Sequence, residues 1–200
     1  MIEFLDFISI ENVVIKQKLS EKFITDNIIA DYNQQVIGAV FIYQKLSEEF
    51  CEKHCASFYL NHILEHQKLS EKFLYKHSEN FNIGQFRIIS KFQILSEDFI
   101  REFQNNICWH NISYHQKLSE DFIREFQNKL NWKFLGHNNL SSSFIKEFQY
   151  KIDKYYLLYT FNLSKDMIAD LLPLDFFYIN MLLSNHRLSK EVKDYCRMFI

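Results

Sequence analysis

A short block of apolar and polar residues returns along most of the chain. The block begins with a Leu-Ser pair, continues with mostly acidic and other polar residues, and then places apolar side chains four, five, eight and twelve positions after the leucine. This spacing is typical of one face of an α-helix of about three turns. In one copy the four apolar residues are Phe99, Ile100, Phe103 and Ile107.

The Leu-Ser pair occurs eight times, with its leucine at positions 19, 46, 69, 95, 118, 140, 163 and 188. Successive leucines are 22 to 27 residues apart. A repeat of this length indicates similar units that stack, because one unit alone cannot bury its apolar face. We therefore predict a single domain over residues 1–200, built as a solenoid of about eight units of 22–27 residues.

The two ends of the chain depart from the regular pattern. Residues 17–160 hold the regular repeats, residues 1–16 precede them as an N-terminal cap, and residues 161–200 hold divergent repeats that include a C-terminal cap. Pro173 interrupts one of the divergent copies, and Lys193 occupies an apolar helix position of another. These departures indicate end units that either cap the stack or mediate assembly.

Each copy carries a clear signal for the start of a helix. Ser96 stands where its hydroxyl can accept a hydrogen bond from the first turn, and Glu97 and Asp98 complement the positive end of the helix dipole. Upstream of the leucine, apolar residues recur six and eight or nine positions before it, which fits one turn of α- or 3₁₀-helix. The predicted fold class is all-α, and each unit is a capped α-helix plus a one-turn helix.

Composition narrows the classes of function. The chain has three Gly and one Pro, too few for phosphate-binding loops or tight hairpins. The formal net charge of −2 gives no field that would concentrate a polyanion, so we expect no nucleic-acid partner. The four cysteines form no framework of a small secreted domain, and no apolar stretch is long enough to span a bilayer. The sequence predicts an intracellular protein without a membrane partner.

The segment from Leu118 to Trp132 resembles a short repeat that occurs in many copies in uncharacterised proteins of giant DNA viruses of amoebae. The resemblance covers nearly the whole chain and is strongest between Gln44 and Trp132. In layout the unit is also similar to the leucine-rich-repeat-variant solenoids, which alternate α- and 3₁₀-helices. The resemblance implies a viral protein that works in the host cytoplasm, and it brings no catalytic residues. Because solenoid surfaces are commonly used for binding, we expect a protein that is not an enzyme, needs no cofactor and engages a host or viral protein.

Two rows of polar residues precede the Leu-Ser pairs. Amide side chains recur two positions before the leucine, and we expect them to form a structural ladder that satisfies backbone groups at the turns between units. The amides are Gln17, Gln44, Gln67, Gln93, Gln116 and Asn138. Lysines recur one position before the leucine, where we expect a solvated edge that is also the candidate binding site for an acidic or mixed-charge protein. The lysines are Lys18, Lys45, Lys68 and Lys117.

Two alternative functions come from other features of the sequence. Cys51, Cys55, His62 and His66 form two pairs, each at a spacing of about one helical turn, which is a pattern that could hold zinc. His62 to His66 also matches the H-x-x-E-H pattern of zinc proteases, although the repeat itself explains most of these positions. The second alternative is a structural protein that assembles with itself through its end units. The oligomeric state stays open.

Overall fold

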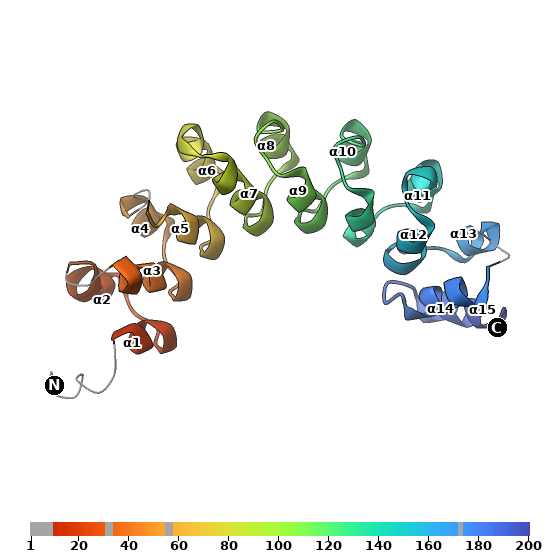
Figure 1. Ribbon diagram of the computed structural model, residues 1–200, viewed down its shortest axis with the longest axis horizontal. Coiled ribbons are helices and arrows are strands. Elements are labelled where there is room, and N and C mark those ends of the chain that lie inside the picture. The colour runs from red at the N-terminus through yellow and green to blue at the C-terminus, as the bar shows by residue number, and fades with distance from the viewer. Residues whose placement is uncertain (1–9, 31–33, 55–57, 172–173) are drawn as a thin grey trace. The chain divides into compact units, whose positions relative to one another are not determined.

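The computed structural model describes residues 10–30, 34–54, 58–171 and 174–200 (Figure 1). Across these ranges the chain forms helices and turns without a β-strand, so the all-helical fold class is confirmed. By packing, the chain divides into two compact units, residues 1–108 and 109–200, which we call unit 1 and unit 2. Over the same described ranges, no helix is both long enough and apolar enough to cross a membrane.

Unit 1 consists of short helices in two rows. Helices α1, α3, α5 and α7 pack side by side in chain order, and the helices that follow the Leu-Ser pairs form the second row (Figure 1). The described elements are α1 (Ile10–Lys16), α2 (Glu21–Ile24), the π-helical turn η2 (Thr25–Ile29), α3 (Gln34–Tyr43), α4 (Glu48–Lys53), α5 (Leu60–His66), α6 (Glu71–His77), the 3₁₀-helix η3 (Ser78–Asn80), α7 (Ile83–Phe92) and α8 (Glu97–Glu102).

Unit 2 is built in the same way. Helix α9 packs on η4, η4 on α12, and α12 on α14, while α15 packs on α14. Its elements are α9 (Trp109–His115), α10 (Glu120–Glu125), the 3₁₀-helix η4 (Trp132–His137), α11 (Ser142–Phe148), the 3₁₀-helix η5 (Gln149–Lys151), α12 (Lys154–Thr160), α13 (Lys165–Asp170), α14 (Phe176–Ser184) and α15 (Lys190–Arg197).

The serine of every Leu-Ser pair caps a helix, as the sequence predicts. In each case the hydroxyl accepts a hydrogen bond from the backbone N–H three residues later. For Ser96 the donor is Phe99 N, at 3.1 Å. The capping serines are Ser20, Ser47, Ser70, Ser96, Ser119, Ser141, Ser164 and Ser189. The Leu-Ser pair therefore marks a helix start wherever it occurs.

The prediction of a three-turn helix after each Leu-Ser pair was wrong. The capped helices α8 and α10 have six residues each and end before Phe103 and Phe126. The chain then turns, and both Asn106 N and Ile107 N donate to the Phe103 carbonyl. Asn and polar residues at this point favour a turn over further helix, so the later apolar residues reach the core from turns.

The helix before each Leu-Ser pair is longer than the one turn that the sequence predicts. Its α-helical copies have seven to ten residues, and only η4 is a 3₁₀-helix. The apolar positions that the motifs share cover only one turn and do not mark the ends of the helix. In α9, for example, the helix continues through Ser113, whose hydroxyl donates to the Trp109 carbonyl. Most of the repeated motifs therefore lack the α/3₁₀ alternation of leucine-rich-repeat-variant solenoids.

Large aromatic side chains fill the interior. Phe99, Phe122 and Phe144, which share one position of the repeated block, are fully buried. In unit 2 the Trp132 ring stacks on Phe144 and Phe148, with ring centroids 6.4 and 5.2 Å apart. The aromatic residues thus form the core that connects consecutive helices. Pro173 and most of the expected N-terminal cap at residues 1–16 lie outside the described residues.

Candidate functional site

Three buried glutamines of unit 1 make the same set of hydrogen bonds to the preceding motif. Gln93 Nε2 donates to the carbonyls of Leu64 and Gln67, at 2.6 and 2.8 Å. Its Oε1 accepts from Leu69 N at 3.1 Å. We call this set of three bonds the amide bridge. Gln44 and Gln67 form it with the equivalent groups of the motifs before them. The side chains of these glutamines therefore form hydrogen bonds with backbone groups of the preceding motif, as the sequence predicts.

In unit 2, different residues make some of the bonds of the amide bridge. Asn138 accepts from Leu118 N at 2.8 Å, but its shorter side chain donates to Leu135 O of its own motif. The neighbouring His137 ring instead contacts the Gln116 carbonyl, with Nε2 to O at 2.8 Å. The side chain of Gln116 is buried, whereas that of Gln17 is exposed.

In the last motif Asn185 takes the role of the glutamine. It stands three residues before the leucine, one position further upstream than the glutamines of the other motifs. Its Nδ2 donates to Leu158 O and Phe161 O, at 2.9 and 2.8 Å, which are the two carbonyls that a glutamine would reach. Its side chain is fully buried. The sequence pattern did not single out Asn185 or His137, because neither stands at the amide position.

The first glutamate of four capped helices, α2, α4, α6 and α10, bonds to the serine of the next motif. Glu48 accepts from Ser70 N and Ser70 Oγ, at 2.6 and 2.8 Å. Glu21 and Glu71 make the same pair of bonds to Ser47 and Ser96. In unit 2, Glu120 accepts from Ser141 N. These carboxylates therefore belong to the contacts between consecutive motifs and are not available to a ligand.

The candidate lysines divide into two kinds. Lys18, Lys45 and Lys68 are exposed in unit 1, and they form no hydrogen bond or ion pair with any residue in the described ranges. Lys117 in unit 2 is also exposed, but its ammonium group donates to the His137 carbonyl at 2.5 Å. Three of the four predicted binding residues are therefore exposed to solvent and have no ion-pair partner among the described residues.

The four candidate zinc ligands are only partly described. Cys51 is completely buried in the unit 1 core, and Cys55 lies outside the described residues. His62 lies beside Gly38, and His66 Nε2 is 4.0 Å from Glu65 Oε2. Among the described residues, no three His, Cys, Asp or Glu side chains cluster closely enough to hold a metal ion. Among the described residues, Cys51, Cys108 and Cys196 take part in no disulfide bond.

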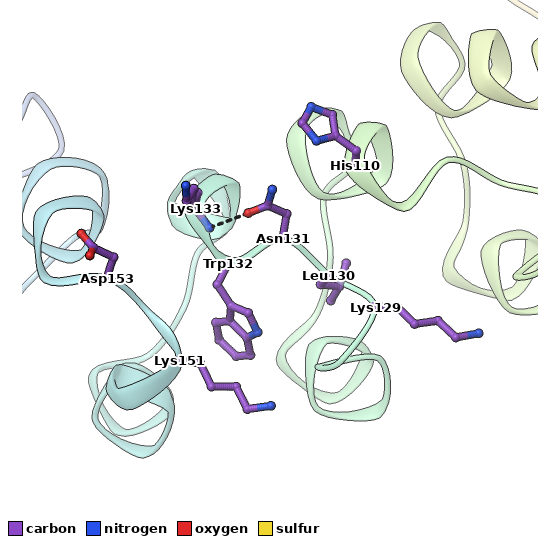
Figure 2. Close-up of a pocket in the computed structure, with 8 residues that line it drawn as sticks. All are labelled: His110, Lys129, Leu130, Asn131, Trp132, Lys133, Lys151 and Asp153. Atoms are coloured by element: carbon purple, nitrogen blue, oxygen red, sulfur yellow. Dashed lines mark hydrogen bonds between the residues drawn. The ribbon is translucent and has the colours of Figure 1, made fainter.

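A pocket of about 520 Å³ opens on unit 2 between the ends of consecutive helices (Figure 2). Three lysines line this pocket, and Trp132 and Leu130 form its apolar part. Figure 2 shows the side chains of Lys151 and Trp132 extending to the same side of the chain, with Asn131 accepting a 3.2 Å bond from Lys133 N. The lining residues are His110, Lys129, Leu130, Asn131, Trp132, Lys133, Lys151 and Asp153.

Aromatic rings flank each lysine of this pocket. Lys151 Nζ lies 6.0 Å from the centroid of Trp132, and it donates to Asn128 Oδ1 at 3.0 Å. Lys133 Nζ lies 5.0 Å from the centroid of Tyr156, and Lys129 Nζ lies 5.3 Å from that of Trp109. Such contacts attract ammonium groups and hold them in place without neutralising their charge.

Two of the pocket lysines could have been found in the sequence, although they do not stand at a position that most motifs share. Lys129 and Lys151 stand at the same position of consecutive motifs, eleven residues after Leu118 and Leu140. The corresponding position of the preceding motif holds Asn106. A search for lysines shared by neighbouring motifs, as well as for those shared by all motifs, would have found the pair.

The described residues thus define an all-helical protein. No protein-family model, curated protein or solved structure matches the chain.

Proposed function

We propose that the eight Leu-Ser motifs stack as one helical solenoid that serves as a non-enzymatic protein–protein interaction module. The stacking is supported by the amide bridge and the glutamate–serine bonds, which connect consecutive motifs within unit 1 in the same way each time. Solenoids are commonly used for binding, because residues on their long surface can vary without disturbing the core. The viral origin and the host-cell setting implied by the sequence resemblance belong to this proposal.

The row formed by Lys18, Lys45 and Lys68 is the observation that carries the proposal. In the motifs of unit 1, glutamine, serine and glutamate all serve contacts between motifs. The lysine is the polar residue of the motif that has no such role, yet it returns at the same position three times in unit 1. A repeated row of solvated ammonium groups suits a protein partner that presents acidic residues at intervals.

The proposal is tested with a pair of variants that carry the same charge change. Lys45→Glu with Lys68→Glu reverses two charges of the row, whereas Lys72→Glu with Lys91→Glu reverses two exposed lysines outside it. Both variants and the wild type are used as bait in amoebal lysate, and captured proteins are quantified by mass spectrometry. We expect the first variant to lose partners that the wild type and the second variant retain.

Identical partner sets for all three proteins would remove the lysine row as the binding site. A mass in solution that rises with protein concentration, without any captured protein, would instead favour self-assembly. Stoichiometric zinc in protein purified without a histidine tag would favour the metal-binding alternative.

A further inference from the structure

Several basic residues of unit 2 pair with carboxylates of the same unit: Arg124 with Glu147, Lys146 with Asp170, and Lys165 with Glu191. Lys133 and Lys151 have no carboxylate partner among the described residues. The charges of these two pocket lysines are therefore not neutralised by a carboxylate of the described residues.

Asp153 does not neutralise the pocket. Its carboxylate caps helix α12 by accepting from Tyr155 N at 2.9 Å, and it forms no ion pair with a described residue. With three lysines and one aspartate, the lining has a formal charge of +2 with His110 counted as neutral. Unit 2 as a whole also has a charge of +2, from 12 Lys and Arg against 10 Asp and Glu, whereas unit 1 has 11 against 15 and a charge of −4.

The cationic lining continues into a second pocket. Lys133 also lines a cavity of about 300 Å³ together with His137, His186, Arg187 and the rings of Tyr114 and Phe134. Acidic residues do not occur in the described lining of this second cavity. Because Lys133 borders both cavities, a ligand of several residues that contacts Lys133 can extend from Lys151 in the larger cavity to Arg187 in the smaller one.

We propose that these two pockets, which share Lys133, bind an extended peptide segment rich in Asp and Glu, an inference that rests on the proposed interaction function and names the partner chemistry for unit 2. The carboxylates pair with Lys133 and Lys151, whose ammonium groups are held by Tyr156, Trp132 and Asn128 before the ligand arrives. Side chains that are already ordered lose less conformational entropy on binding, which favours affinity.

The chemistry of the pocket favours carboxylates over a nucleic acid. Trp132 is 9% exposed and its Nε1 donates to the Gln127 carbonyl, so its face is not open for stacking with bases.

The test uses the full chain and a rhodamine-labelled peptide of alternating Glu and Ser, with the Gln–Ser peptide for comparison. Binding is followed by fluorescence anisotropy at low salt. We expect the wild type to bind the Glu peptide about tenfold or more tightly than the Gln peptide, and Lys133→Gln with Lys151→Gln to remove most of that difference. Raising the salt concentration should weaken binding, because partly exposed ion pairs are screened.

Two control variants separate the pocket from general charge. Lys190→Gln with Lys193→Gln removes the same charge from α15, outside the lining, and should bind the peptide like the wild type. Lys133→Arg with Lys151→Arg keeps the charge and should retain binding. Circular dichroism of each variant shows whether the helices are intact. If the glutamine variant unfolds, loss of binding in a folded arginine variant would still contradict the inference.

Equal binding of the Glu and Gln peptides, or unchanged binding by the Lys133→Gln and Lys151→Gln variant, would overturn the inference. Tighter binding of an oligothymidylate than of the Glu peptide at the same salt would replace it with a nucleic-acid site. The lysate experiment with the unit 1 lysines is independent of this pocket. Failure of the peptide test alone removes only the site in unit 2, whereas failure of the lysate test alone removes the role of unit 1.

Discussion

At the scale of single residues, the contacts between motifs survive changes in the amino acid that makes them. Asn138 is too short to reach the carbonyl of Gln116, and His137 reaches it instead. Asn185 makes the donor contacts of a glutamine from the preceding position in the chain. In both cases buried carbonyls of the preceding motif keep a hydrogen-bond partner, because a buried carbonyl without one is costly.

Gly136 and Gly38 are expected to respond in opposite directions to substitution by alanine. A Cβ on Gly136 would lie 2.6 Å from the carbonyl oxygen of Thr160, so Gly136→Ala forces η4 and α12 apart. We expect this change to lower the free energy of unfolding by about 1–3 kcal/mol. A Cβ on Gly38 would meet only His62, at 3.7 Å, so Gly38→Ala should raise stability by roughly 0.5–1 kcal/mol through helix propensity. Urea denaturation followed by circular dichroism checks both signs.

His54 is expected to make stability depend on pH. Burial against the Phe41 and Phe50 rings lowers its pKa from the usual value near 6.5, and Lys53 lowers the pKa further. The folded state therefore favours the neutral ring, and this contribution is lost as the pH falls through the unfolded pKa towards the folded one. His54→Phe keeps the ring contacts and cannot titrate. Its stability should fall less than that of the wild type between about pH 7.5 and 5.5; equal slopes would contradict the assignment.

At the scale of elements, short helices depend on their ends and on their neighbours. A helix of six residues such as α8 is too short to be stable alone in water, since nucleation is unfavourable. Its serine cap and its acidic first turn define where it begins, and the amide bridge of Gln93 connects the turn before it to the preceding motif. The helices therefore form together with the contacts between them.

Gln93 is expected to contribute more to stability than any exposed ion pair. Gln93→Met keeps the size of the side chain but leaves two carbonyls and one N–H of the preceding motif without their partner. We expect a loss of about 1–3 kcal/mol in the free energy of unfolding. Lys53→Gln breaks the exposed pair with Glu49 and serves as the control, because such pairs add little to stability. Similar losses in the two variants by chemical denaturation would show that the amide bridge is not a major stabilising contact.

At the scale of the whole molecule, the proposed solenoid predicts dimensions that a single compact domain cannot have. Helices packed about 8–10 Å apart in eight successive units would extend over about 60–80 Å. A compact chain of 200 residues would have a radius of gyration of only about 16–17 Å. Small-angle X-ray scattering should therefore give a clearly larger radius of gyration. A value near that of the compact chain would rule out the continuous stack.

The amino-acid sequence by itself determined the helical class, the eight helix starts and the positions of the core aromatic residues. These features depend on local spacing and on the capping chemistry of serine, both of which are visible along one segment of chain. Only the tertiary structure decided where the helices end, that His137 and Asn185 take over glutamine contacts, and that Lys129, Lys133 and Lys151 share one pocket. Those outcomes depend on which groups from different motifs come within hydrogen-bonding or van der Waals distance, and the linear spacing of residues does not contain that distance.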